Sequence, residues 1–213
     1  MTDAKLEPII EYHDDGKVEY AYTVDEKGQK QGPYEEYWDN GRLREKCTYK
    51  DGKKDGPYER YYDNGRLEIK CTYKDGEYNG QYESYWPNGQ LFTKCSYKDG
   101  YEDGSCEKYQ PNGRLWGKCT YKDGKEDGPY EAYHDNGQLR EKGVYKMGVE
   151  LKGKEAEEYL KEWEEKRIMA PTQLRQAVKR AEVAKFRKIH SYKHAGRIIE
   201  KKNWFQKLFR LGR

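Results

Sequence analysis

Cysteines are the first residues in this sequence whose type and spacing could support chemistry. Cys47, Cys71, Cys95 and Cys119 recur every 24 residues. If each period forms two strands, these thiols lie on every second strand, roughly 9.6 Å apart, which is beyond the reach of a disulfide. No histidine alternates with them to complete a tetrahedral zinc site. We interpret them as small, half-buried side chains, and we expect no metal and no cofactor.

Two other patterns could resemble an active site. His190 and His194 are four residues apart, but the neighbouring residues are cationic and supply no third ligand, which favours a solvated helix face. A glutamate also recurs in each period, and a lysine accompanies every one. All five pairs are equivalent, whereas an active site breaks symmetry. We therefore expect no catalytic residues and no enzyme.

The elements that carry these residues form an internal repeat. Residues 30–149 hold five 24-residue units. The unit period is marked by the glycines Gly32, Gly56, Gly80, Gly104 and Gly128. Each unit has Asn-Gly at its middle, as at Asn40-Gly41, which favours a two-residue type I′ turn with φ above zero at both residues. The first four units end in Lys-Asp-Gly, and the fifth ends in Lys-Met-Gly. Two turns per unit predict two strands per unit, and so ten antiparallel strands.

The strand register follows by counting outward from the turn. Such counting places Trp38 opposite Leu43, Tyr37 opposite Arg44, Glu35 opposite Lys46, and Tyr34 opposite Cys47. The same offset puts a glutamate opposite a lysine in every unit, and opposite charges across a hairpin support this register.

The same counting makes Cys106 a cross-strand neighbour of Cys119. In a reducing compartment we expect both to be free thiols.

Alternation along the strands predicts two unlike faces. One face collects Tyr34, Trp38, Leu43, Cys47 and Tyr49 with their equivalents. The other face collects Glu35, Tyr37, Arg44, Lys46 and Thr48 with theirs. We expect the first face to be the more buried one.

The two ends of the chain differ from the repeats. Residues 1–29 read as a degenerate N-terminal cap, in which 12–28 form a partial copy that covers a sheet edge. Residues 150–213 read as a basic helical region. Its first helix has an apolar stripe of Ala156, Tyr159, Leu160 and Trp163 and is predicted to cap the last hairpin.

Basic residues dominate the rest of this region. Thr172 can begin a second helix, and Asn203 a short third one. The second helix carries the basic residues Arg175, Lys179, Arg180, Lys185, Arg187 and Lys188. Residues 166–213 have a net charge of +13, and the remainder of the chain has −10. The basic tail could contact nucleic acid, an anionic membrane, or the acidic sheet of its own chain.

The unit YxxYYxNGxLxxxxxYKDGKxxG resembles the MORN-variant repeat of bacterial antitoxin-like proteins, in which tandem hairpins form a sheet. The pattern is carried by Tyr37, Asn40, Gly41, Leu43, Tyr49, Asp51, Gly52 and their equivalents. The fourth unit departs from it, because Cys106 replaces a tyrosine and Gln110 replaces an aromatic residue or histidine. A partner that docks on that column would meet a gap there.

These observations predict an elongated antiparallel hairpin-repeat sheet followed by an α-helical C-terminal segment. Together with the resemblance, they favour a non-enzymatic protein-binding module, an antitoxin or immunity-like inhibitor of a toxin or effector, for example one that processes nucleic acid. Exposed aromatics carry most interface energy. The candidate partner contacts are Tyr37, Trp38, Tyr61, Tyr62, Tyr85, Trp86, Tyr109, Trp116 and Tyr133.

The alternative function is a scaffold whose basic tail anchors it to nucleic acid or to an anionic membrane. No signal peptide and no apolar run near the roughly 20 residues of a membrane span is found, so a soluble, cytoplasmic protein is expected. The sequence leaves open the oligomeric state and which face binds.

Overall fold

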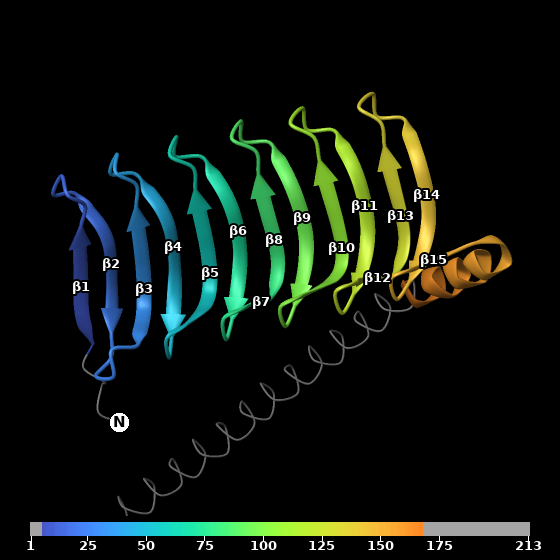
Figure 1. Ribbon diagram of the computed structural model, residues 1–213. Coiled ribbons are helices and arrows are strands. Elements are labelled where there is room, and N and C mark those ends of the chain that lie inside the picture. The colour runs from blue at the N-terminus through green and yellow to red at the C-terminus, as the bar shows by residue number, and fades with distance from the viewer. Residues whose placement is uncertain (1–5, 168–213) are drawn as a thin grey trace, which may run out of the picture. The chain divides into compact units, whose positions relative to one another are not determined.

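In the computed structural model, which describes residues 6–167, the chain forms one antiparallel sheet whose strands follow each other in sequence order (Figure 1). The N-terminal hairpin is β1 (Glu7–Tyr12) and β2 (Val18–Val24). The repeat strands are β3 (Lys30–Tyr37), β4 (Leu43–Lys50), β5 (Lys53–Tyr61), β6 (Leu67–Lys74), β7 (Glu77–Tyr78), β8 (Gly80–Tyr85), β9 (Leu91–Lys98), β10 (Tyr101–Tyr109), β11 (Leu115–Lys122), β12 (Lys125–Glu126), β13 (Gly128–Tyr133) and β14 (Leu139–Lys146). A short β15 (Val149–Leu151) and a helix over residues 153–167 follow.

The predicted hairpin-repeat sheet is confirmed. Each repeat contributes one hairpin, and two of the ten repeat strands are broken into short pieces, β7 with β8 and β12 with β13. The sheet and the helix as far as Leu160 belong to one compact unit. Within residues 6–167, no helix is long and apolar enough to span a membrane.

The Asn-Gly turn differs from the prediction. The Gly41 amide donates to the Trp38 carbonyl (2.7 Å) and the Trp38 amide to the Arg42 carbonyl (2.8 Å), which closes a three-residue loop. The φ angle is positive at Gly41 (78°) but not at Asn40. The Asn40 side chain instead accepts a hydrogen bond from the Arg42 amide (2.9 Å). The type I′ prediction was wrong here, because asparagine stabilises this loop through its side chain.

The two-residue turn with two positive φ angles lies at the other end of the hairpin. Asp51 and Gly52 have φ angles of 49° and 76°, and Lys50 pairs with Lys53 across them. Each repeat therefore alternates a three-residue loop with a tight two-residue turn.

A β-bulge compensates for the three-residue loop. Tyr37 pairs with Leu43 rather than with Arg44, and the register then shifts at Arg44 so that Glu35 pairs with Lys46 as predicted. The glutamate–lysine register is confirmed in all five hairpins. The predicted pairs Trp38 with Leu43 and Tyr37 with Arg44 were wrong.

The bulge also exchanges the faces of two residues. Leu43 shares a face with its partner Tyr37, whereas the Arg44 guanidinium lies 4.5 Å from the centre of the Trp38 ring. We call the face with Tyr34, Cys47, Tyr49 and their equivalents the tyrosine–cysteine face. The opposite face, with Glu35, Tyr37, Lys46 and their equivalents, is the glutamate–lysine face.

The tyrosine–cysteine face holds the core, as predicted. A cross-strand row alternates tyrosine and cysteine, and its buried members Tyr34, Cys47, Tyr58 and Cys71 form one apolar cluster. Tyr49 packs against this cluster. Small thiols between large rings let neighbouring strands approach while the rings cover the sheet.

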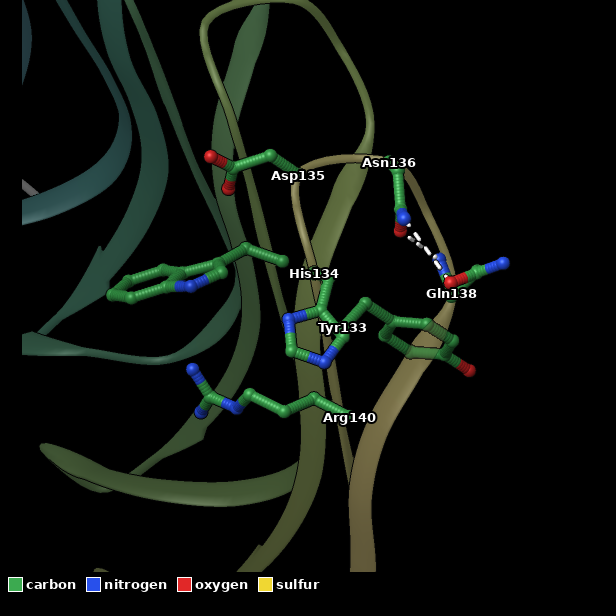
Figure 2. A pocket seen from close by; sticks show the side chains of 7 residues that line it. Tyr133, His134, Asp135, Asn136, Gln138 and Arg140 are labelled. Atoms are coloured by element: carbon green, nitrogen blue, oxygen red, sulfur yellow. Dashed lines mark hydrogen bonds between the residues drawn. The ribbon is translucent and has the colours of Figure 1, made fainter.

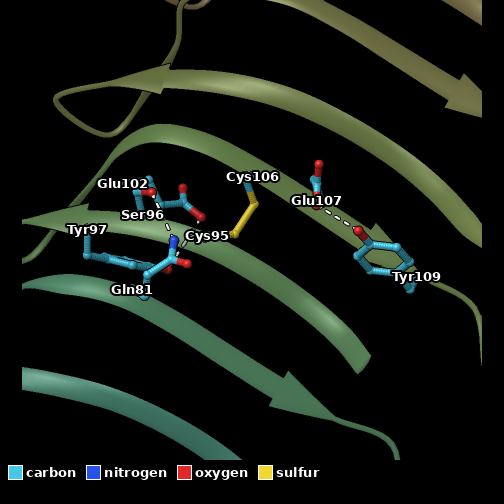
Figure 3. Close-up of a disulfide and its surroundings, with 8 residues drawn as sticks. All are labelled: Gln81, Cys95, Ser96, Tyr97, Glu102, Cys106, Glu107 and Tyr109. Carbon is cyan, nitrogen blue, oxygen red and sulfur yellow. Dashed lines mark hydrogen bonds between the residues drawn. A yellow bond between two sulfur atoms is a disulfide. The ribbon is translucent and has the colours of Figure 1, made fainter. Parts of the chain in front are cut away.

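Cys106 continues this row and changes its chemistry. It pairs with Cys119 on β11, as predicted, and with Cys95 on β9. Cys95 and Cys106 form a disulfide with their Cα atoms 4.0 Å apart (Figure 3). The predicted free thiol at Cys106 was therefore wrong, whereas Cys119 is free. Because Cys106 occupies a tyrosine position, its neighbour on each adjacent strand is a cysteine. The 24-residue spacing of the other four cysteines does not reveal this contact.

The N-terminal end of the sheet is a complete hairpin rather than a partial copy. β1 begins at Glu7, and β2 pairs with β3. The loop after Tyr12 has the same hydrogen bonds as the repeat loops, from the Gly16 amide to His13 and from the His13 amide to Lys17.

The C-terminal end of the sheet is capped by the first part of the helix over residues 153–167, namely residues 153–160. The Tyr159 hydroxyl donates to the Asp127 carboxylate, and the Lys146 ammonium lies 5.1 Å from the centre of the Tyr159 ring. Val144 on β14 and its strand partner Leu151 on β15 are buried. The predicted stripe of Ala156, Tyr159, Leu160 and Trp163 is the partly buried side of this helix. The six basic tail residues, the histidine pair and the predicted third helix lie outside the described residues.

Candidate binding surface

The glutamate–lysine face is uniform along the sheet. In each repeat a tyrosine hydroxyl donates to the glutamate two residues earlier, at 2.5 Å from Tyr37 to Glu35 and 2.6 Å from Tyr109 to Glu107. The same bonds join the pairs Tyr61 and Glu59, Tyr85 and Glu83, and Tyr133 and Glu131. The bond to Glu35 and partial burial raise the pKa of Tyr37 to about 12. These hydroxyls already have partners within their own strand.

Lysines join neighbouring strands on the same face. The Lys94 ammonium meets Glu83 within its hairpin (3.1 Å). Lys46 instead meets Glu59 of the next repeat (2.7 Å), which lowers the pKa of that carboxyl. Each such pair contributes little alone. Because the tyrosine–glutamate hydrogen bond recurs in all five repeats, we interpret this face as structural.

The tyrosine–cysteine face varies from repeat to repeat outside its core row. One position holds Glu36, Arg60, Ser84, Lys108 and Ala132 in turn. The bulge position holds Arg44, Glu68, Phe92, Trp116 and Arg140 in turn. A surface that differs between repeats can distinguish one partner from another, because specificity is a difference between contacts. This face is the candidate binding surface.

Aromatic residues at the loops of this face connect successive repeats. Trp38 Nε1 donates to the Tyr61 carbonyl (3.1 Å), and Trp86 Nε1 to the Tyr109 carbonyl (3.1 Å). The hydroxyl of Tyr62 makes the corresponding bond to the Tyr85 carbonyl. In these three repeats, the aromatic side chain bonds to the residue that precedes the loop of the next hairpin.

The fourth repeat interrupts the column of aromatic residues at the loops, which consists of Trp38, Tyr62 and Trp86. Gln110 stands in place of the ring and donates from Nε2 to the Asp135 carboxylate (3.0 Å). An open hollow of about 510 Å³ lies at the loop of the last hairpin, and we call it the Trp116 hollow. Its walls are Trp116, Tyr133, His134, Asp135, Asn136, Gln138 and Arg140. In Figure 2, His134, Asp135 and Arg140 project to one side of the hairpin, whereas the Tyr133 ring projects to the other.

Trp116 and Arg140 lack the contacts that their counterparts have in earlier repeats. Arg44 pairs with Glu36 (2.8 Å), and the centre of the Phe92 ring lies 4.4 Å from that of Trp86, with the two rings tilted. Within residues 6–167, Trp116 has no aromatic partner and Arg140 has no ion pair. Trp116 is 48% exposed.

A second hollow adjoins the first on the same face. It has a volume of about 310 Å³, and its walls include Trp116 and Arg140 as well as Cys106, Cys119 and Tyr121. Trp116 and Arg140 therefore contribute to both concave regions of repeats four and five.

The nine predicted partner contacts divide between the two faces. Tyr37, Tyr61, Tyr85, Tyr109 and Tyr133 have hydroxyls bound to glutamates of the glutamate–lysine face. Trp38, Tyr62 and Trp86 hold neighbouring repeats together, which leaves Trp116 as the most open of the nine.

Sequence reasoning missed His134, Asp135 and Arg140 in the hollow. The sequence signal that could have indicated the hollow is Gln110, which replaces the aromatic residue of the first three repeats.

A chain built of similar hairpins in tandem, with one uniform face and one varied face, belongs to the class of repeat proteins. The chain is a member of the MORN repeat variant family, whose model matches residues 30–51, 54–75, 78–99, 102–123 and 126–147. Repeats of this family are in general modules that bind proteins or membranes, and the family is not a known enzyme family. No curated protein matches the chain.

Proposed function

We propose that this protein binds a protein partner through the tyrosine–cysteine face of repeats four and five, with the Trp116 hollow at the centre. The observation that supports this proposal is an exposed Trp116 in a concave surface beside Arg140, which has no ion pair among residues 6–167. Tryptophan, tyrosine and arginine are the residues that carry most binding energy when a partner desolvates them. The rigid sheet loses little entropy on binding.

Charge favours a partner with a cationic surface. Residues 1–165 have a net charge of −10, which attracts cations over a distance and accelerates encounter. The finer proposal is that the partner is a toxin or effector protein with a cationic cleft, such as one that processes nucleic acid, and that binding inhibits it. The resemblance to antitoxin-like repeats supports this choice.

The binding proposal is tested with matched variants of the full chain. Affinity capture from the native cell identifies a partner, and calorimetry then compares the wild type with Trp116→Ala and Arg140→Ala. Each substitution should weaken binding by about 2 kcal/mol, roughly 30-fold, if these residues are hot spots. Leu139→Ala is the control, because Leu139 is also 48% exposed but pairs with Tyr133 on the glutamate–lysine face. Equal losses in all three variants would contradict the choice of face.

Inhibition is tested separately. The purified protein is added to the captured partner and the partner's activity is measured, with Trp116→Ala as the variant that should inhibit poorly. A partner that binds at the hollow but remains fully active would remove the inhibitor proposal and leave the binding proposal intact.

The charge of the tail favours a second candidate function. Residues 166–213 have a net charge of +13, which suits anchoring to nucleic acid or to an anionic membrane while the sheet recruits a partner. Binding of the full chain to DNA, or to vesicles containing an anionic lipid, should then weaken steeply with added salt. Salt-insensitive binding, or none, would argue against anchoring.

A further inference from the structure

Two adjoining positions of the tyrosine–cysteine face hold a different pair of residues in the fourth repeat than in the first two repeats. In the second repeat, the Lys54 ammonium lies 4.4 Å from the centre of the Tyr58 ring. The first repeat has the same arrangement of a lysine over a tyrosine ring. The corresponding residues of the fourth repeat are Glu102 and Cys106. A cation over a ring has thus been replaced by a carboxylate beside a thiol.

These two replacements create a group of three metal-binding side chains. The sulfur atoms of Cys95 and Cys106 and a carboxylate oxygen of Glu102 all lie within 4.8 Å of one another. Both cysteines are 1% exposed, and Glu102 is half-buried. The Tyr97 hydroxyl donates to the Glu102 carboxylate (3.4 Å) and so helps to orient it (Figure 3).

We propose that, when the disulfide is reduced, Cys95, Cys106 and Glu102 bind one Zn²⁺ ion or a similar divalent cation. Two thiolates and one carboxylate form a ligand set that zinc accepts, and water takes the fourth tetrahedral position. The hollow beside Cys106 gives the ion and its water a route to solvent.

The disulfide and the metal exclude each other, because the same two sulfurs form both. A dithiol reductant transfers two electrons and two protons to Cys95 and Cys106 and itself becomes a disulfide. Metal binding then releases the two thiol protons to solvent. The site therefore binds metal only in the reduced protein.

The same row of the sheet contains a natural control. Cys47 and Cys71 are buried free thiols, but Tyr58 pairs with both and lies between them. The nearby Lys54 ammonium would repel a metal ion. These two cysteines should therefore contribute nothing to metal binding.

Cobalt is the probe for this site, because its bonds to thiolate sulfur produce a near-ultraviolet charge-transfer absorption. Full-length protein is reduced with a dithiol, desalted without air and titrated with Co²⁺. We expect saturation at one Co²⁺ per chain, displacement by Zn²⁺, and no absorption change in the protein that retains its disulfide. A reduced protein that gives no charge-transfer band would overturn the proposal.

Variants separate this site from other metal binding. Cys106→Tyr restores the residue of the second repeat, so the sheet should be kept, and it should abolish the band. Glu102→Gln keeps the size of the side chain and should weaken Co²⁺ binding by at least the roughly 10-fold effect of an outer-sphere partner. The double variant Cys47→Ser with Cys71→Ser should bind as the wild type does. A band that survives Cys106→Tyr, or disappears in the double variant, would contradict the assignment, as would unchanged affinity in Glu102→Gln.

Discussion

Gln110 shows how one residue can interrupt the column of aromatic residues at the loops and leave a hollow beside it. At the equivalent places, Trp38 and Trp86 donate to a carbonyl of the next repeat and cover it. The shorter glutamine side chain instead donates to Asp135 and accepts from Asn112, and the Trp116 hollow lies at the loop of the repeat that a ring would have covered. Repeat proteins can thus acquire a site by the loss of one side chain, while the other repeats keep the scaffold intact.

The substitution Gln110→Trp should reverse this change. The local sequence Gln110-Pro-Asn-Gly matches Trp86-Pro-Asn-Gly, so the indole should donate to the Tyr133 carbonyl. The free energy of unfolding should rise by about 1 kcal/mol, the usual net value of a hydrogen bond. Denaturant titration measures this change, with Gln110→Ala as control. A variant with tryptophan that is no more stable than the one with alanine would contradict the role of the column.

At the scale of the hairpin, two irregularities cancel. The three-residue loop after Trp38 shifts the strands by one residue, and the bulge at Arg44 shifts them back. Glutamate and lysine therefore meet on one face in every repeat, while the bulge residue turns toward the other face. This arrangement leaves one face free to keep its ion pairs and the other free to vary.

The ion pairs between repeats should make stability depend on pH. Lys46 and the Tyr61 hydroxyl lower the pKa of Glu59 from its ordinary 4.5. Because the folded-state pKa is the lower one, the stabilisation is complete above the ordinary value and is lost as pH falls through the folded value. Glu59→Gln should cost about 0.5–1 kcal/mol at neutral pH. This difference should shrink as the pH falls below the ordinary value of 4.5.

Thermal unfolding at several pH values measures this dependence. Glu26→Gln serves as the control, because Glu26 is exposed in a turn outside the repeats. A cost for Glu59→Gln that stays constant down to the most acidic condition would show that the carboxylate charge is not what stabilises the sheet.

At the scale of the molecule, the chain combines an acidic body with a basic C-terminal region. The N-terminal hairpin of β1 and β2 forms one end of the sheet, and β15 forms the other.

We expect the repeat body to carry partner binding. A fragment of residues 1–169 should bind the protein partner within roughly threefold of the full chain, and a fragment of residues 170–213 should not bind it, because the rigid aromatic surface lies in the repeats. Calorimetry at low and high salt compares the three proteins, and circular dichroism checks that the first fragment keeps its strands. Binding carried by the second fragment and abolished by salt would instead favour the anchored scaffold.

The sequence by itself determined the period, the hairpins, the buried face and the glutamate–lysine register. These features are local and occur five times, so each copy tests the others. Only the tertiary structure decided the turn type at Asn40, the faces of Leu43 and Arg44, and the bond between Cys95 and Cys106. The bulge offsets the extra loop residue, so the register of the glutamate–lysine pairs is the same as with a two-residue turn. Counting residues outward from the turn therefore cannot detect it. The disulfide and the Trp116 hollow join different hairpins, where contacts depend on how strands of neighbouring repeats meet.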